Sequence, residues 1–438
     1  MLEFLIDGGI LLFAAIPIIW YIRKHQERRK KSEVKWQESI ETGRMEPVSL
    51  HPFIDPNICI GTAACVPACP EGDILGIIDG RGKLVEPTNC IGHGECYRAC
   101  PVDAITLVFG TEQRGVDIPH LQEDFETNVD GIHIVGELGG MGLIRNAVTQ
   151  GREVMEYLAP ELTKQAKKKD PGVSDVVVVG AGPAGLSATA KAIELGFSYT
   201  LLDQNDVGGT ILSYPRQKVV MTQPMDIPIY GKSKFREITK EELLDLWYDV
   251  IEKTGMEIQT QQKVEDVRRE NGHFKVITQR GQFKGRKVIL AIGRRGTPRK
   301  LGVPGEDTSK VTYHLKDPEQ YRGKKCLVVG GGDSAVEAAL QLSGEPETSV
   351  TVSYRKDAFS RIKKKNLNRI NDAIDLGKVE VIWNSNVQEI HPDKVDIDVD
   401  GEMITRANDF VFVFIGGIMP SGFLKKLGIK VETKFGEA

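Results

Sequence analysis

The feature that most constrains the fold is a glycine-rich turn that occurs twice, each time between a buried strand and a helix. In the first copy the valines at 176–179 lead into Gly180, Gly182 and Gly185, and a helical pattern follows. Glycines at this spacing let the backbone approach a pyrophosphate at the start of a helix. A second apolar strand ends at Asp203, about twenty residues on, where an acid binds ribose hydroxyls. The first copy therefore predicts a dinucleotide-binding unit.

The second copy lies in KKCLVVGGGDSAVEAALQL, and the strand that follows it, TSVTVSYRK, ends without an acid. Arg355 and Lys356 stand where the ribose contact is expected, which favours the extra phosphate of NADP over NAD. The alternative is an exposed basic turn. The candidate nucleotide-binding residues of this copy are Gly330, Gly332, Asp333, Ser334, Arg355 and Lys356.

Cysteines define a separate segment, because six of the seven lie between Cys59 and Cys100. They form two runs, CIGTAACVPACP and CIGHGECYRACP, and such clustering in a long chain indicates metal rather than a disulfide framework. The runs resemble those of bacterial two-cluster ferredoxins, in which the fourth cysteine of each run serves the other cluster. The resemblance implies two ligand sets, one of Cys59, Cys65 and Cys100 and the other of Cys90, Cys96 and Cys69.

Each ligand set is one thiolate short of a conventional four-iron site, and Thr62 and His93 stand where the missing cysteines would be. Three interpretations are open: three-iron clusters, four-iron clusters completed by His93 or a hydroxide, or a fold that has lost its metal. The six retained thiols favour metal. Ligation by His93 would raise the reduction potential, because neutral imidazole is a poorer donor than thiolate. The alternative for His93 is a loop residue beside a three-iron cluster.

The two dinucleotide units, joined by KVILAIGRRGTPRKLGVPGE and closed by FVFVFIGGIMP, resemble the thioredoxin-reductase-like flavoproteins. In that family an NAD(P) domain is inserted into the FAD domain, and a strand and helix of the FAD domain come last. A matching stretch, TNVDGIHIVGELGG, here lies ahead of the flavin unit. We therefore expect a circularly permuted FAD domain, with its strand at 127–137 and its closing helix at 141–158. The alternative is an unrelated strand and helix that join two domains.

Within this family the sequence is most similar to ferredoxin:NADP reductases and bacillithiol-disulfide reductases, which share GAGPAGL and GGGDSAVEAAL. Cys326 is the only cysteine after Cys100, so the redox-active C-x-x-C of thioredoxin reductases is absent and no catalytic side chain is singled out. The resemblance implies FAD as cofactor, with Glu137 in place of the family's flavin-contacting Asp. The candidate flavin contacts are Gly136, Glu137, Gly180, Gly182, Gly185, Asp203, Gly209 and Thr210.

The N-terminus has an apolar run, 8–22, that is followed by six basic residues between Arg23 and Lys31. This order predicts a single membrane-spanning helix in the inner membrane, with the remaining chain in the cytoplasm. The alternatives are an interfacial helix and a helix buried against a partner subunit. The net charge of −4 gives no general case for nucleic-acid binding.

The predicted fold class is α/β, with two Rossmann-like domains for FAD and NAD(P), preceded by an α+β ferredoxin domain and a transmembrane helix. The predicted function is a homodimeric NAD(P)H-linked oxidoreductase that relays electrons between nicotinamide, FAD and iron–sulfur clusters and a redox protein or membrane partner. The alternatives are an electron-transfer subunit of a membrane complex and a reductase of small disulfides with structural clusters. The predicted segments are 1–32 for the anchor, 48–112 for the ferredoxin domain, 113–160 for the permuted piece, 161–172 for a linker, 173–298 for the FAD domain, 299–408 for the NAD(P) domain and 409–438 for the return to the FAD domain.

Overall fold

The structure is a computed structural model that describes residues 2–47, 50–72, 74–165, 170–221, 223–294 and 297–437, with the backbone alone for 2–14, 221 and 297. It divides into two compact units, one formed by Met1–Arg114 with Gly436–Ala438 and the other by Gly115–Phe435. Parts of the predicted anchor, ferredoxin domain, linker, FAD domain and return segment lie outside the described residues, namely 1, 48–49, 73, 166–169, 222, 295–296 and 438.

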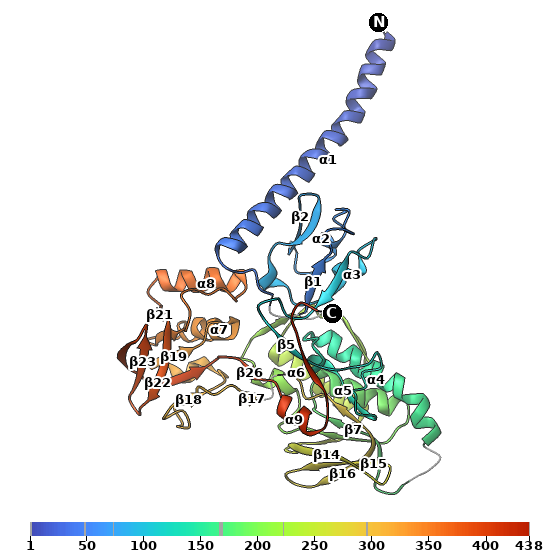
Figure 1. The fold of residues 1–438 in the computed structure, drawn as a ribbon, viewed down its shortest axis with the longest axis vertical. Helices are drawn as coiled ribbons and strands as arrows, with labels where there is room; N and C mark the ends of the chain where they lie inside the picture. The colour runs from blue at the N-terminus through green and yellow to red at the C-terminus, as the bar shows by residue number, and fades with distance from the viewer. Residues whose placement is uncertain are drawn as a thin grey trace. The chain divides into compact units, whose positions relative to one another are not determined.

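The smaller unit begins with a long helix, α1 (Leu2–Glu41; Figure 1). Its apolar run is bracketed by Asp7 and Arg23 and is therefore shorter than the roughly 20 residues that a span needs. None of the helices in the described part of the chain has an apolar stretch of the length that a bilayer crossing requires. The predicted membrane anchor and inner-membrane location are therefore wrong.

The second half of α1 belongs to the folded part of this unit. Ser39 donates a hydrogen bond of 2.8 Å to the Val85 carbonyl, and Lys35 pairs with Glu86 at 2.9 Å. The sequence after residue 22 is rich in Glu, Lys, Arg and Gln, which favour helix. The helix consequently runs past residue 32, where the sequence predicted the anchor to end.

The rest of the smaller unit repeats one pattern twice: a strand, a cysteine run, a short helix and a second strand. Strands β1 and β4 pair antiparallel, as do β2 and β3. Cys65 and Cys96 pack with Leu75 and Ile105 in a small buried core, so sulfur lies near the centre of this unit. The elements are β1 (His51–Ile54), α2 (Cys65–Ala68), β2 (Leu75–Ile78), β3 (Arg81–Leu84), η1 (Pro87–Asn89), α3 (Glu95–Arg98) and β4 (Ile105–Val108).

The larger unit contains a seven-stranded sheet with the order β13-β8-β7-β16-β15-β14, in which β6 also pairs with β16. The strands around β7 are parallel, and the valines of β7 are almost completely buried, as expected for a parallel strand covered on both faces. The strands are β6 (Ile132–Ile134), β7 (Ser174–Val179), β8 (Tyr199–Leu202), β13 (Ile258–Gln259), β14 (Val264–Glu270), β15 (His273–Thr278) and β16 (Gln282–Leu290). The helices of this part are α4 (Ile144–Gln165), α5 (Pro183–Glu194) and α6 (Lys240–Thr254), and four short strands, β9 (Val219–Met221), β10 (Met225–Ile227), β11 (Gly231–Ser233) and β12 (Glu237–Thr239), precede α6.

Strand β6 and helix α4 form the segment that the sequence placed out of the usual order. Residues 132–134 of β6 run parallel to 288–290 of β16. Helix α4 packs closely on α5, since a Cβ at Gly151 would lie 2.1 Å from the Ala184 carbonyl oxygen. Its buried stripe ends at Leu162, so the helix continues past the predicted end at 158 and includes the first residues of the predicted linker.

A second, five-stranded parallel sheet has the order β18-β25-β19-β20-β21. The apolar strand β25 pairs in parallel with β19, so it belongs to this sheet, whereas the sequence assigned it to the return segment at 409–438. The elements here are β18 (Val311–Thr312), η4 (Pro318–Tyr321), β19 (Lys325–Val329), α7 (Asp333–Leu342), β20 (Ser349–Ser353), α8 (Lys364–Asp375), β21 (Val379–Ile382), the antiparallel strands β22 (Ser385–Ile390), β23 (Lys394–Val399) and β24 (Glu402–Ala407), and β25 (Phe410–Val413).

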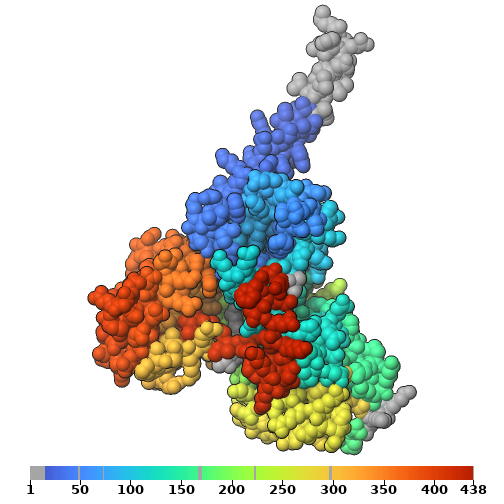
Figure 2. Space-filling model, viewed as in Figure 1, coloured from blue at the N-terminus to red at the C-terminus, as the bar shows by residue number. Residues whose placement is uncertain are grey.

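After β25 the chain passes through β26 (Gly417–Ile418), which pairs with β17 (Thr297–Pro298), and through α9 (Ser421–Lys426). Strand β27 (Val431–Lys434) then pairs antiparallel with β5 (Val116–Pro119). Figure 2 shows this dark red C-terminal segment on the surface, against the cyan residues near 116–119. The end of the larger unit thus lies beside its beginning.

Candidate cofactor sites

The first glycine turn joins β7 to α5. A Cβ at Gly185 would lie 1.8 Å from the Gly180 carbonyl oxygen, so a side chain is excluded where the helix approaches the strand. Gly182 differs, because no atom of the described residues lies within 4 Å of a Cβ built there. It is the N-cap of α5, and space beside a helix N-terminus suits a phosphate group. The turn therefore has the form that a pyrophosphate requires.

Asp203 fixes this turn from the end of β8. Its carboxylate accepts hydrogen bonds from the amides of Ala181 at 2.6 Å and Asn205 at 2.7 Å. Burial raises the pKa of Asp203, and these two hydrogen bonds oppose that shift. The sequence predicted a ribose contact for this residue. Since an ionised carboxylate has about four acceptor positions, it can brace the turn and still accept from a ribose.

The loops on either side bring further predicted residues to the start of α5. A Cβ at Gly136 would lie 3.1 Å from that of Ala184, and one at Gly209 would lie 3.2 Å from the Cα of Gly182. Gly136 and Glu137 begin η2 (Gly136–Gly139), and Gly209 and Thr210 begin η3 (Gly209–Ser213). The predicted flavin-binding residues that gather around this helix start are Gly136, Glu137, Gly180, Gly182, Gly185, Asp203, Gly209 and Thr210.

The second glycine turn joins β19 to α7 and is built in the same way. Gly330 has φ +136°, and a Cβ there would lie 2.3 Å from the Phe414 carbonyl oxygen. Gly331 lies against the ring of Tyr354. Gly332, the N-cap of α7, has no described atom within 4 Å of a built Cβ. The open position again faces the space at a helix start.

Asp333, a predicted nucleotide contact, also binds the chain through its carboxylate. It accepts hydrogen bonds from the Lys363 amide at 3.0 Å and the Asn366 side chain at 2.7 Å. Asn366 also binds Glu337 at 3.1 Å and is buried. Sequence reasoning missed Asn366, whose only signal is a polar residue on the buried face of α8. Asp333 therefore positions the basic segment before α8.

The basic residues at this turn are exposed at the carboxyl edge of the sheet. Arg355 lies two residues after the end of β20 and is exposed, Lys356 is partly buried, and Ser334 is exposed in the first turn of α7. The hydrogen bond from Lys363 to Asp333 ties the following basic segment to the same helix start. The arrangement offers positive charge near the place where a parallel sheet binds the nucleotide ribose.

Cys59, Cys65 and Cys100 line one hollow of about 310 Å³ in the smaller unit, together with Thr62. Cys59 accepts a hydrogen bond from the Gly82 amide and Cys100 accepts one from the Ala104 amide, each at 3.3 Å. The structure therefore brings together the three thiols that the ferredoxin resemblance assigned to one cluster.

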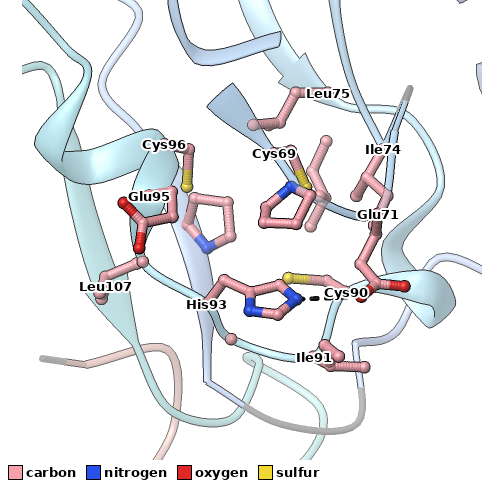
Figure 3. A pocket seen from close by; sticks show the side chains of 15 residues that line it. Cys69, Glu71, Ile74, Leu75, Cys90, Ile91, His93, Glu95, Cys96 and Leu107 are labelled. Carbon is pink, nitrogen blue, oxygen red and sulfur yellow. Dashed lines mark hydrogen bonds and ion pairs between the residues drawn. The ribbon is translucent and has the colours of Figure 1, made fainter. Parts of the chain in front are cut away.

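Cys69, Cys90 and Cys96 line a second hollow of about 360 Å³, with His93 at its edge (Figure 3). The His93 ring binds Glu71 through Nε2 at 2.9 Å. Sequence reasoning missed Glu71; its only signal is a carboxylate two residues after Cys69. This set also matches the ligand set that the resemblance implied.

The thiols fit a cationic metal group rather than simple packing. Burial raises the pKa of Cys65 to about 11 and that of Cys90 to about 12, and nearby cysteines add to both shifts. Iron binds cysteines as thiolates and releases their protons, so three thiols around one hollow can serve as ligands of a cationic metal group. The hollows and the amides that donate to sulfur are consistent with iron–sulfur clusters.

Comparison with known proteins assigns both parts of the chain. Residues 177–436 match the profile of the pyridine nucleotide-disulphide oxidoreductase family, and residues 51–101 match that of the 4Fe-4S dicluster domain. The chain is 34% identical over 219 residues to a ferredoxin–NADP reductase of Ignicoccus hospitalis, which covers 49% of this chain and 66% of that protein. It is also 28% identical over 267 residues to the bacilliredoxin reductase Bdr of Bacillus subtilis. This alignment covers 59% of this chain and 82% of that protein.

A solved structure of the bacillithiol disulfide reductase Bdr from Staphylococcus aureus is also similar. Its TM-score is 0.53 at 27% identity, and the match covers 58% of this chain and 80% of that one. The chain aligns with just under two thirds of the length of the Ignicoccus reductase. The match to the dicluster domain lies ahead of the match to the reductase family in the chain. Because the family match spans more than half of its residues, the chain belongs to the pyridine nucleotide-disulphide oxidoreductase family.

Proposed function

We propose that the chain is an NADPH-linked oxidoreductase that passes electrons between nicotinamide, FAD and two iron–sulfur clusters, and exchanges them with a redox protein. The observation that carries this proposal is that three thiols gather in each of two hollows, in a unit fused to a two-dinucleotide reductase. FAD, when bound, exchanges two electrons with a nicotinamide and single electrons with a cluster. A relay of these groups needs no acid–base side chain.

The residues of the chain then have binding and orienting roles. The open positions at Gly182 and Gly332 let phosphate groups approach the starts of α5 and α7. Asp203 holds the first turn and would accept from a ribose, whereas Arg355 and Lys356, close after the end of β20, would bind a 2′-phosphate. This difference between the two turns supports FAD at the first and NADP, rather than NAD, at the second.

The order of segments supports a circular permutation of the FAD domain. β6 extends the parallel sheet beside β16, and α4 lies along α5, although both precede the glycine turn in sequence. The family match begins only at residue 177, and β27 lies beside β5. A reordered chain in which residues 115–165 follow residue 435 is therefore expected to fold and bind FAD. Loss of FAD binding in that chain would argue against the permutation.

The test of the proposed function is a spectrum of the full chain, purified anaerobically. We expect bound FAD, iron and acid-labile sulfide, and an electron paramagnetic resonance signal that changes when NADPH is added. Oxidation of NADPH with an artificial acceptor would separate an enzyme from an electron-transfer subunit without turnover. Absence of iron and sulfide after anaerobic reconstitution would refute the relay. Size-exclusion chromatography would test the expected homodimer.

A second candidate is a reductase of small disulfides, and the similarity to the bacillithiol disulfide reductase favours it. Cys326, the one cysteine between residues 101 and 438, is buried in β19, and burial raises its pKa to about 12. Such a thiol is a poor nucleophile. We therefore expect NADPH-dependent reduction of bacillithiol disulfide to be far slower than reduction of a protein acceptor, and the reverse ratio would favour this second function.

A further inference from the structure

The two thiol-lined hollows differ at the position of the missing cysteine. Thr62 is exposed, and its hydroxyl accepts a 3.4 Å hydrogen bond from the amide of Ala64 in its own loop. His93 is only 11% exposed and is held by Glu71 at 2.9 Å. Figure 3 shows its ring at the edge of the hollow, next to Cys90 and below Cys69 and Cys96. The imidazole therefore lines the same hollow as the three thiols and is held there by Glu71.

The backbone does not account for this difference, because the two loops turn alike. Gly61 and Ala63 have φ values of 71° and 61° on either side of Thr62, and Gly92 and Gly94 have values of 78° and 77° on either side of His93. The same left-handed turn thus presents a short hydroxyl to one hollow and a longer imidazole to the other. The side chain alone distinguishes the two positions.

Glu71 connects His93 to a cluster ligand. It lies two residues after Cys69, and its side-chain carboxylate binds His93 Nε2 at 2.9 Å. The carboxylate is 15% exposed, so it lies largely out of solvent beside the hollow. Orienting a metal-bound histidine is a role that suits this position, because ligating histidines generally donate their second ring N–H to a carboxylate or carbonyl.

We infer that His93, through Nδ1, is the fourth protein ligand of a four-iron cluster held by Cys69, Cys90 and Cys96, and that Glu71 is the residue that positions it. The other hollow then has three protein ligands, and its cluster is a three-iron one or has an exchangeable fourth iron. This inference rests on the proposed function, since it requires that both hollows hold clusters. It makes the two clusters of one chain chemically different.

The test is pulsed electron paramagnetic resonance on the reduced full chain, produced in cells that are supplied with ¹⁵N-labelled histidine. We expect hyperfine coupling between the cluster electron spin and one histidine nitrogen. His93→Ala should abolish the coupling. His93→Cys should keep the four-iron cluster, abolish the coupling and lower its midpoint potential, because thiolate donates more charge than imidazole.

Variants of Glu71 test whether this residue positions His93. Variants of Thr62 test whether the histidine coupling comes only from the hollow that contains His93. Glu71→Gln can still accept from Nε2–H, so the coupling should remain, while loss of the charge raises the midpoint potential. Glu71→Ala should weaken retention of the fourth iron against a chelator about 10- to 100-fold, the usual effect of removing the partner of a metal-bound histidine. Thr62→Ala should leave the nitrogen coupling unchanged, and Thr62→Cys should convert the other cluster to a four-iron signal.

The outcomes separate this inference from the proposed function. A chain that binds iron and sulfide and is reduced by NADPH, but lacks the nitrogen coupling, would overturn the inference and leave the relay standing. Coupling that persists in His93→Ala would also overturn it. A chain that binds neither iron nor sulfide would overturn both. Coupling that His93→Ala abolishes and Glu71→Gln preserves would establish the ligand and its orienting carboxylate.

Discussion

Alanine at Gly182 should separate cofactor binding from folding. Gly182 has φ −83° and ψ −178°, an extended conformation that alanine adopts, and a methyl group there would meet no described atom within 4 Å. Reduced freedom of the unfolded chain favours alanine by about 0.4–1 kcal/mol. Alanine is a poorer N-cap than glycine by a similar amount, roughly 1 kcal/mol or less. We therefore expect the FAD-free Gly182→Ala protein to unfold within about 1 kcal/mol of the FAD-free parent.

The same methyl group should weaken FAD binding. It would fill the space through which a pyrophosphate oxygen reaches the first amides of α5. Loss of one hydrogen bond to a charged group corresponds to about 1.5–3 kcal/mol. At 1.4 kcal/mol per factor of ten, the dissociation constant for FAD should rise about 10- to 150-fold. Quenching of flavin fluorescence measures this constant, and thermal unfolding of the FAD-free protein measures the fold.

Two other glycines provide the controls. Gly332→Ala, at the open position of the second turn, should raise the dissociation constant for NADPH by a similar factor and leave FAD binding unchanged. Gly185→Ala should destabilise even the FAD-free protein, because its Cβ would lie 1.8 Å from the Gly180 carbonyl oxygen. The reasoning would be refuted if Gly182→Ala bound FAD as tightly as the parent, or if Gly332→Ala released FAD and kept NADPH.

Three further predictions concern the nucleotide preference, the lone thiol and the packing of α4. Arg355→Ala should raise the KM for NADPH about tenfold with little change for NADH, since a lost charge-assisted contact is worth about 1.5 kcal/mol or more; equal effects on both would argue against a 2′-phosphate site. Cys326 should resist iodoacetamide at pH 8 in the folded protein and react after denaturation, because burial raises its pKa to about 12 and keeps the neutral thiol; peptide mass spectrometry checks this, and rapid labelling of the folded chain would contradict it. Gly151→Ala should lower the free energy of unfolding by about 1–3 kcal/mol despite the better helix propensity of alanine, since its Cβ would lie 2.1 Å from the Ala184 carbonyl oxygen; urea denaturation showing equal or higher stability would contradict it.

Spacing along the chain was sufficient to predict the features that depend on local backbone. The strand, glycines and helix around Gly180 leave few alternatives for the turn, and the ferredoxin-like runs imply which cysteines meet. Contacts between distant loops were not predictable in this way. Glu71 and His93 are 22 residues apart and meet only because the two cysteine runs face each other. Asn366 binds Asp333 across 33 residues because α8 packs against α7.

The predictions that differ from the structure concern two apolar segments, whose packing partners cannot be identified from composition alone. Apolar residues followed by basic ones predicted an anchor, but helix α1 continues to Glu41 and its second half packs through Ser39 on the chain near Val85. The apolar strand at 410–413 was assigned to the FAD domain, but it pairs with β19 in the second sheet. A short apolar strand carries no signal that selects one parallel sheet over the other, because both sheets bury such strands on two faces.

Each unit of this chain contains a backbone motif that occurs twice, and the two copies of each motif differ at a side chain that we expect to determine what each copy binds. The glycine turns after β7 and β19 share their geometry, yet the next strand is followed by the buried carboxylate of Asp203 in one and, two residues after its end, by the exposed Arg355 in the other. The cysteine loops likewise share a left-handed turn, which carries Thr62 in one and His93 in the other. Because the scaffold is the same within each pair, exchange of the distinguishing side chain should leave the fold undisturbed, but the property should transfer only where the residue that holds this side chain is also present. A chain carrying both Thr62→His and His93→Thr should therefore lose histidine coupling at its original cluster, and should gain none at the other, where residue 62 has no carboxylate equivalent to Glu71 within hydrogen-bonding reach among the residues that line that hollow.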